Sequence, residues 1–284
     1  MPDTSSSIPR VAFQGEHGAF SEAAAIQLLG EGISTVPRAT FDAAFAAIGD
    51  GAADVLLAPV ENSLAGSVVR VYDLLLESRL SIVAETILHI EHHLIGCPGA
   101  TLEGLSSVAS HPMALAQCER FFETHPSLKR VPAEDTAGSV REMMAQGDKS
   151  RAAVAGKRAA RHYGAAILRE GIQDNAENFT RFMLLLPPVE AQRYRGVDSK
   201  KISLAMRLAH KPGALLASLE PFARHGVNLL KIESRPIHGK PFEYQFYLDV
   251  EAGRNEALEK ALEEVRAATT QLRVLGRYVA ARRA

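Results

Sequence analysis

The feature that most constrains this chain is an alternation, from Val11 onward, of short apolar runs with stretches of helical periodicity. The apolar runs predict strands at residues 11–14, 54–60, 82–95, 130–132, 152–155, 165–168 and 182–186. The stretches between them predict a helix from Ser21 and helices at 68–77, 113–123, 136–146 and 157–162. Strands separated by crossover helices usually pair in parallel. The alternation therefore predicts an α/β fold.

The pattern breaks at Pro187 and Pro188, and the polar stretch 190–199 has no apolar periodicity, so it is the predicted linker. Beyond it the order is strand, helix, strand, strand, helix and strand, at 201–208, 213–225, 229–235, 242–250, 255–268 and 271–279. That βαββαβ order is the ferredoxin-like arrangement. A chain of 284 residues is therefore expected to form two different domains.

Charge and composition exclude several classes of partner and site. The formal net charge is −1, so we expect no general attraction to nucleic acid or to membranes, which leaves only a local basic patch open. The two cysteines, Cys97 and Cys118, lack the CxxC spacing of zinc sites and redox pairs. Residues 1–10 have no apolar stretch, and no segment approaches the roughly 20 apolar residues of a membrane span. We therefore expect a cytoplasmic protein.

Two motifs mark the second domain. Pro212-Gly213-Ala214-Leu215 opens its first predicted helix, and Glu233-Ser234-Arg235-Pro236 ends its second predicted strand. With the βαββαβ order, these motifs resemble an ACT domain over residues 200–280. The resemblance implies a homodimer or homotetramer that binds phenylalanine at a subunit interface. It assigns the effector to Gly213, Ala214, Leu215, Asn228, Glu233, Ser234 and Arg235.

Local chemistry leaves two interpretations of this effector site open. Gly213 at a helix N-terminus would leave backbone N–H groups free for a ligand carboxylate, which the helix dipole also favours. Alternatively, Gly213 only permits a tight turn, and Glu233 and Arg235 form a solvated pair at a strand end.

Five motifs of the first domain resemble prephenate dehydratases, in that family's order. They are Phe13-Gln14-Gly15 with Gly18-Ala19-Phe20-Ser21, Pro59-Val60-Glu61-Asn62-Ser63 with Gly66, Ser110-His111-Pro112 through Gln117-Cys118, Asp135-Thr136-Ala137, and Asn178-Phe179-Thr180-Arg181-Phe182. The resemblance implies a catalytic domain over residues 9–188, built like a type 2 periplasmic binding protein. Its two α/β lobes would enclose the active site, with crossovers near 85–92 and 175.

The family's reaction is a decarboxylating dehydration in phenylalanine biosynthesis. Prephenate loses its ring carboxylate as CO₂ and its hydroxyl as water and becomes phenylpyruvate. Aromatisation drives this carbon–oxygen lyase reaction, so we expect no cofactor, and the sequence has neither a GxGxxG after a strand nor a Walker A loop. The ACT resemblance adds feedback regulation by phenylalanine.

The resemblance makes Thr180 the catalytic residue, with its hydroxyl bonded to the leaving oxygen. Because a threonine hydroxyl has a high pKa, we expect it to act within a network or to orient the departing group, while water or another donor supplies the proton. Arg181 either anchors a substrate carboxylate or forms a structural ion pair. The resemblance also places Phe182 in the substrate site.

Asn62 and Ser63 should sit at the C-terminal end of a strand, where open α/β sheets bind ligands. Uncharged donors suit the ring carboxylate, because a cation there would stabilise the reactant more than the transition state. Glu61 either organises this loop or is a surface charge. The alternative for the three residues together is a turn with local side-chain to backbone bonds.

Three further polar residues are candidates for the substrate site. Ser110 is a plausible helix cap, and Gln117 follows two helical turns later, so both could face one side of a cleft. Alternatively, Ser110 is only a helix cap and Gln117 is only an exposed polar residue of the helix. Ser21 could cap its helix and also bind a substrate carboxylate. Ala19 and His17 depart from the family pattern, so no hydroxyl role is carried to position 19.

The histidines His89, His92 and His93 form the most metal-like cluster in the chain. Adjacent residues of a strand point to opposite faces, and no cysteine or carboxylate has matching spacing. We therefore expect no metal and interpret them as core or hinge histidines.

Two alternatives to a prephenate dehydratase stay open. Arogenate is an alternative substrate, because it has an amino group where prephenate has a keto group. A non-catalytic amino-acid sensor is another, since fold alone does not fix function. Thr180 together with Asn62, Ser110 and Gln117 favours catalysis. No helical segment precedes Val11 that could be a chorismate mutase, so a monofunctional enzyme is expected.

Overall fold

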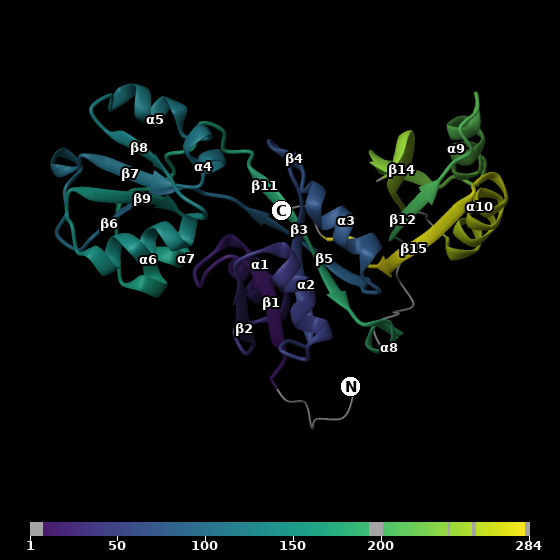
Figure 1. Ribbon diagram of the computed structural model, residues 1–284, viewed down its shortest axis with the longest axis horizontal. Helices are drawn as coiled ribbons and strands as arrows, with labels where there is room; N and C mark the ends of the chain where they lie inside the picture. The colour runs from purple at the N-terminus through teal and green to yellow at the C-terminus, as the bar shows by residue number, and fades with distance from the viewer. Residues whose placement is uncertain (1–7, 193–200, 238, 252–253, 282–284) are drawn as a thin grey trace. The chain divides into compact units, whose positions relative to one another are not determined.

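The computed structural model describes residues 8–192, 201–237, 239–251 and 254–281 (Figure 1). It forms two compact units. The first contains the chain up to Leu74 together with Thr86–Met183, and the second contains Leu75–Glu85 and the chain from Leu184. The boundaries fall inside two strands, β5 (Ser81–His89) and β11 (Phe179–Leu186), and near the end of α3 (Val69–Glu77).

The first unit has two lobes, each built on its own sheet. In the first lobe β1 pairs in parallel with β2 on one side and β3 on the other, and the strand order is β11-β3-β1-β2. A short hairpin joins β3 to β4. The bounds are β1 (Arg10–Gln14), α1 (Phe20–Leu29), β2 (Ser34–Arg38), α2 (Phe41–Gly49), β3 (Val55–Asn62) and β4 (Gly66–Ser67).

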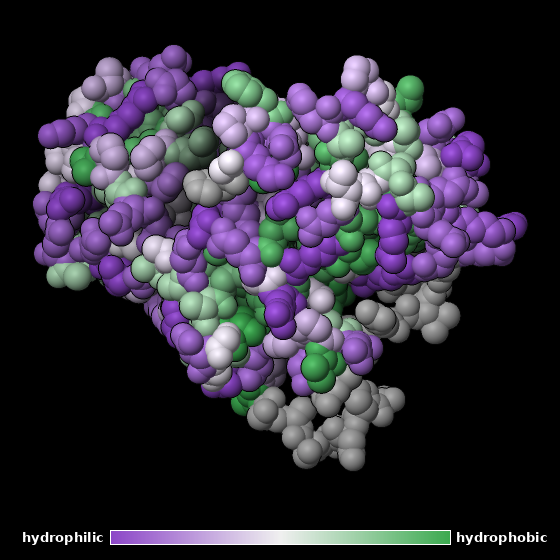
Figure 2. Space-filling view, turned by 45° about the vertical axis from the view of Figure 1, so that its right-hand side comes forward, coloured by the Kyte–Doolittle hydropathy of each residue, from purple (hydrophilic) through white to green (hydrophobic). Residues whose placement is uncertain are grey.

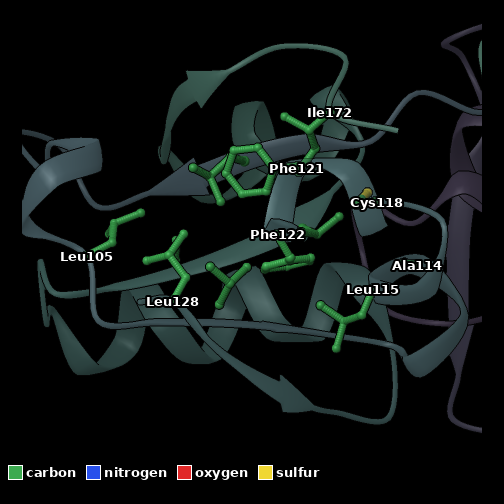
Figure 3. Packing of buried hydrophobic residues seen from close by; sticks show 12 residues of the cluster. Leu105, Ala114, Leu115, Cys118, Phe121, Phe122, Leu128 and Ile172 are labelled. Carbon is green, nitrogen blue, oxygen red and sulfur yellow. The ribbon is translucent and has the colours of Figure 1, made fainter. Parts of the chain in front are cut away.

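The second lobe is a five-stranded mixed sheet of order β10-β6-β9-β7-β8. Side chains of α4 and α5 form one core with Leu105, Leu128 and Ile172 (Figure 3). In that core, burial raises the pKa of the Cys118 thiol to about 12, so this cysteine is an inert filler. The bounds are β6 (His93–Gly96), η1 (Leu102–Gly104), β7 (Ser107–Ser110), α4 (Pro112–Ala116), α5 (Glu119–Thr124), β8 (Lys129–Pro132), α6 (Thr136–Gln146), β9 (Arg151–Ala155), α7 (Lys157–Tyr163) and β10 (Ala166–Arg169).

The second unit contains an antiparallel sheet of order β13-β14-β12-β15, and Gly276 of β15 pairs with Ile82 of β5. Its order β12-α9-β13-β14-α10-β15 confirms the predicted ferredoxin-like unit. A buried pair, Lys201 Nζ with both carboxylate oxygens of Glu85 at 2.8 and 2.9 Å, ties β12 to β5. The bounds are α8 (Pro188–Ala191), β12 (Lys201–Arg207), α9 (Ala214–Arg224), β13 (Asn228–Ile237), β14 (Lys240–Glu251), α10 (Asn255–Ala268) and β15 (Gln271–Tyr278).

The structure differs from the predicted elements in a few places. The predicted strand at 82–95 is two strands, β5 and β6, and the predicted helix at 113–123 is α4 and α5. The short elements β2, α2, β4 and β7 have no counterpart among the predicted ones. Most of the predicted linker, 190–199, lies outside the described residues.

Within the described residues, no helix is long and apolar enough to cross a membrane. The face shown in the space-filling view is largely hydrophilic with scattered apolar side chains (Figure 2).

Glu22 of α1 links the two lobes of the first unit. Glu22 is 2% exposed. Its carboxylate accepts hydrogen bonds from Gly18 N–H at 2.8 Å and Arg158 Nε of α7 at 2.8 Å, and bonds His17 Nδ1 at 3.0 Å. Burial alone would raise the pKa of Glu22, but these hydrogen bonds outweigh it and lower that pKa to about 2. A buried carboxylate is therefore charged and satisfied between the lobes.

Replacing Glu22 by Gln should make the unfolding free energy depend less on pH in the acid range. A carboxyl whose pKa falls from 4.5 unfolded to about 2 folded stabilises fully above the higher value and loses that contribution as the pH falls toward the lower. Between these pH values the wild type should lose up to about 3 kcal/mol more unfolding free energy than Glu22→Gln. Denaturant unfolding at stepped pH measures this difference.

The matched control is Glu31→Gln, which removes a carboxyl that is 76% exposed and 3.9 Å from the same Arg158. Glu31→Gln should leave the dependence of the unfolding free energy on pH unchanged. If the wild type and Glu22→Gln showed the same dependence, the charge of Glu22 would contribute nothing to stability.

Candidate functional site

A cavity of about 580 Å³ lies in the first unit and takes its lining from both lobes. From the first lobe come the ends of β1 and β3, the first turns of α1 and α2, and residues of β11. From the second lobe come α4 with its flanking residues and the start of α6. The sequence-predicted residues among the lining are Ser21, Asn62, Gln117, Thr180 and Phe182.

Asn62 and Thr180 are in direct contact in this cavity. Asn62, the last residue of β3, donates from Nδ2 to Thr180 Oγ1 at 2.9 Å. The orientation of this amide is fixed, because Asn62 Oδ1 accepts from the backbone N–H groups of Leu64 and Ala65 at 3.0 and 2.8 Å. Since Thr180 Oγ1 accepts a hydrogen bond from Asn62, its own proton is available to a substrate.

Gln117 is joined to the same pair through a buried residue. Asn178 accepts from Asn62 Nδ2 at 2.7 Å and donates to Gln117 Oε1 at 3.0 Å. His92 Nε2 lies 2.9 Å from the same oxygen. Burial lowers the pKa of His92, despite its bond to Gln117, and favours the neutral ring.

Sequence reasoning assigned no site role to Asn178 or His92. Asn178 stood in a quoted motif, and His92 was interpreted as a core or hinge residue. Within the described residues, no three His, Cys, Asp or Glu side chains are placed to hold a metal ion.

Ser21 and Phe182 line the cavity in different ways. Ser21 does not cap α1 as expected. The cap position is Ala19, which has no capping side chain, and Ser21 lies in the first turn. That turn therefore faces the cavity without a side-chain cap, as an anion-binding helix end would. Phe182 is almost completely buried in β11.

Three predicted substrate residues lie outside the cavity lining. Ser63 Oγ donates to Glu177 O and accepts from Phe179 N–H, both at 2.9 Å, and so fastens β11 beside the β3 turn. Arg181 Nη1 lies 3.9 Å from Glu61 Oε2, in agreement with the structural ion pair that was the alternative to a carboxylate anchor.

The third, Ser110, is fully buried at the end of β7 and donates to Val154 O at 2.6 Å. Its expected capping role is wrong, because α4 begins one residue later and His111 Nδ1 accepts from Met113 N–H there. The substrate roles of Ser63, Ser110 and Arg181 stay predictions.

The charged groups of the lining are all acidic. They are Asp42, which pairs with Arg70, and Glu134 and Asp135. Burial raises the pKa of Asp135, although its bond from Gly138 N–H opposes that shift. Among the described residues that line the cavity there is no lysine or arginine. To a carboxylate, the described lining therefore offers neutral hydrogen-bond donors beside these acidic groups.

The predicted effector residues lie in the second unit, on two elements. Gly213 precedes α9 with φ +78°, a left-handed conformation that favours glycine. Ala214 and Leu215 line a second cavity of about 150 Å³ together with Lys211 and residues of β14. The others lie along β13 and outside that lining, namely Asn228, Glu233, Ser234 and Arg235. Their roles stay predictions.

Comparison with known proteins now identifies the family. The family model described as prephenate dehydratase matches residues 11–188, and the ACT domain model matches residues 202–268. Arogenate dehydratase 3, chloroplastic, of Arabidopsis thaliana is 41% identical over 287 residues, covering 95% of this chain and 66% of that protein.

Two solved structures resemble the chain over 95% of its length, each with a TM-score of 0.84. One is a prephenate dehydratase from Arthrobacter aurescens in complex with L-Phe, 30% identical and covered to 89%. The other is GqqA, described as a novel type of quorum quenching acylase, 36% identical and covered to 98%.

The expected cytoplasmic location is wrong. Three relatives from Arabidopsis thaliana are named as chloroplastic, which contradicts it. The expectation rested on the lack of an apolar leader, but transit peptides to plastids are amphipathic and rich in Arg and Ser. Such a lack therefore does not separate the two compartments.

Family membership confirms the resemblance predicted from the five motifs, and with it the fold class, the dehydratase function and the carbon–oxygen lyase class. The two sheets of the first unit and the βαββαβ unit that follows agree with the matched models. The chain belongs to the prephenate dehydratase family and has a C-terminal ACT domain.

Proposed function

We propose that this chain converts prephenate to phenylpyruvate, CO₂ and water in the cavity of the first unit. The observation that carries the proposal is the contact of Asn62 with Thr180, whose geometry leaves the threonine proton available. The proposal is tested by incubating the purified protein with prephenate and measuring phenylpyruvate. Lack of turnover by folded protein would favour a non-catalytic sensor.

Thr180 meets the leaving hydroxyl in this proposal. As the bond between the ring and its carboxylate breaks, the electron pair enters the ring, and the C–O bond opposite breaks. The departing oxygen gains negative charge and needs a hydrogen bond and then a proton to leave as water. Thr180 supplies the hydrogen bond, and its bond from Asn62 makes the hydroxyl a better donor. Water entering with the substrate supplies the proton, because a threonine has too high a pKa to remain deprotonated.

The same geometry argues against acyl transfer through Thr180, the kind of reaction that the name of the similar acylase suggests. A threonine nucleophile needs a general base within hydrogen-bond reach of its hydroxyl. Its partner here is the NH₂ group of Asn62, which is a donor and not a base. Thr180 is therefore arranged to give a hydrogen bond rather than to attack.

Arogenate is a second candidate substrate, favoured by a specific feature of the lining. Glu134 and Asp135 place acidic groups at the cavity, and the described lining has no lysine or arginine. An ammonium group would be attracted there, and arogenate has one where prephenate has a keto group. One relative is named for both activities, arogenate dehydratase/prephenate dehydratase 2. Separate assays of phenylalanine from arogenate and phenylpyruvate from prephenate distinguish the two.

Thr180→Val should remove most turnover while the fold persists. Valine has nearly the shape of threonine and suits strand β11, so only the hydroxyl is lost. Loss of one donor to a developing oxyanion costs about 100- to 1000-fold in kcat. Steady-state rates on both substrates measure this, and far-ultraviolet circular dichroism checks the fold.

The matched control is Thr180→Ser, which restores the hydroxyl and should stay within about tenfold of the wild type, since it loses one methyl group of packing. A valine variant with nearly normal kcat would remove Thr180 from the reaction.

We further propose that phenylalanine binds the second unit near the start of α9 and inhibits the enzyme, which forms a homodimer or homotetramer. Gly213 supports this, because its left-handed conformation begins α9 without a capping side chain. The cavity beside it has Lys211 in its lining, which would attract the ligand carboxylate.

Gly213→Trp should weaken inhibition by phenylalanine at least about tenfold, equal to about 1.4 kcal/mol of binding. The indole would fill the space at the start of α9, which is open around Gly213. Inhibition curves at fixed prephenate measure the change, with basal rate as the internal reference.

Gly226→Trp is the matched control, because Gly226 follows α9 with φ +66° and equally open surroundings. It carries the same backbone strain at the opposite end of the helix and should keep normal inhibition. Unchanged inhibition in Gly213→Trp would place the effector elsewhere.

A further inference from the structure

We propose that His92 and Asn178 are positioning residues of this site. Together they hold the oxygen of the Gln117 amide, so that the NH₂ group of Gln117 is the part left for the substrate. The inference rests on the proposed function, since it names the groups that arrange its donors.

The direction of the hydrogen-bond chain is set at one end by the backbone. The N–H groups of Leu64 and Ala65 can only donate, so Asn62 Oδ1 must accept and Asn62 Nδ2 must donate. A second contact agrees, because Nδ2 also lies 3.2 Å from the carbonyl oxygen of Phe179, which can only accept. If the oxygen and the NH₂ group of the Asn62 amide exchanged places, these bonds would be lost.

That direction passes through Asn178 to Gln117. Asn178 Oδ1 accepts from Asn62, so Asn178 Nδ2 is the donor to Gln117 Oε1 at 3.0 Å. Asn178 is fully buried, and its backbone carbonyl accepts from Ile90 N–H at 2.8 Å, so it is held on both sides. A buried amide that is satisfied in only one orientation stays in that orientation.

His92 closes the chain from the other end. Because Gln117 Oε1 is an acceptor, the His92 nitrogen 2.9 Å away, Nε2, must carry a proton. The other nitrogen, Nδ1, is buried and has no hydrogen-bond partner among the described residues. A second proton there would bury an unpaired donor and a charge, so the ring is neutral with its proton on Nε2.

The consequence is a prearranged donor in the cavity. Gln117 Oε1 is occupied twice, while Gln117 Nε2 has no partner among the described residues and stays accessible in the lining. Thr180 and Gln117 thus both direct hydrogen-bond donors into the cavity, and the same chain of hydrogen bonds orients both of them. Donors fixed in advance need no reorientation when charge develops in the transition state.

The first test reads the tautomer and does not depend on turnover. Protein with ¹⁵N-labelled histidine rings is examined by two-bond ¹H–¹⁵N correlation near neutral pH, and the His92 signals are assigned as those missing from His92→Gln. We expect a protonated Nε2 and a bare Nδ1. A proton on Nδ1 instead would overturn the proposal, even if the enzyme is active.

The second test is a double-mutant cycle. His92→Leu should lower kcat/KM about 100-fold, as misplacement of a substrate-binding group does. In a Gln117→Met background the same change should cost no more than about twofold, since His92 then has nothing to position. His92→Gln, whose amide NH₂ can reach the place of Nε2, should stay within about tenfold of the wild type. Equal costs in both backgrounds would mean that His92 does not act through Gln117.

Asn178→Asp covers the case in which His92→Leu does not fold. A protonated carboxyl at this buried position could still donate to Gln117, so Asn178→Asp is paired with Asn178→Leu, which has a similar volume and no donor. Asn178→Leu should show the same dependence on the Gln117 background. If the wild type turns over neither prephenate nor arogenate, the proposed function fails, while the tautomer measurement still decides whether His92 orients Gln117.

Discussion

The site depends on a constraint at the end of β3, where the backbone N–H groups of Leu64 and Ala65 both point at the oxygen of Asn62. Backbone donors cannot reverse, so they give the neighbouring side chains a single direction of donation. Thr180 receives a hydrogen bond because of it, and so does Asn178. Without these two donors, only the longer contact of Asn62 Nδ2 with the Phe179 carbonyl, at 3.2 Å, would set the direction of the Asn62 amide. The polarity of the site is therefore a property of the main chain, and the side chains transmit it.

Close contacts between the two lobes of the first unit lie beside the cavity. A Cβ at Gly18 would lie 2.6 Å from the Cα of Ala159 in α7, so only glycine fits between the first lobe and the second. Position 18 also has φ +86°, which independently favours glycine. Glu22, four residues on, accepts from Gly18 N–H and from Arg158 of α7. The motif around Gly18 thus joins the lobes beside the first turn of α1, which lines the cavity. A substitution that spread the lobes here would also separate the donors contributed by β3 and β11 from Gln117, which follows α4.

Elements with complete local signals were predicted well from the sequence, and elements defined by distant partners were not. Helix α6 has the predicted bounds because Asp135 caps its first turn and Gly147, with φ +67°, ends it. The predicted helix at 113–123 is interrupted because the carboxylate of Asp174 accepts from the N–H groups of Glu119 and Arg120 and starts a new helix there. The apolar run at 82–95 ends its first strand where Ile90 N–H bonds the carbonyl of Asn178. The role of His92 was hidden for the same reason, because the residues that define it lie 25 and more positions away. The motifs did identify Asn62, Gln117 and Thr180, which the fold brings together.

The acidic and neutral lining has a consequence for catalysis that does not depend on which substrate is used. A cation against the ring carboxylate would bind the reactant tightly, and that binding would be lost as CO₂ departs, so the barrier would rise. In the proposed reaction a neutral donor such as Gln117 binds the carboxylate less strongly than a cation, so less binding is lost when CO₂ leaves. The leaving oxygen has the opposite need, because its charge grows, and there a donor already in place stabilises the transition state more than the reactant. The proposed function places Gln117 near the departing charge and Thr180 near the developing charge, so the donors of one ordered chain would meet both needs. Its order is fixed from the Leu64 and Ala65 amides to His92, so the protein meets the cost of that arrangement in folding rather than during the reaction.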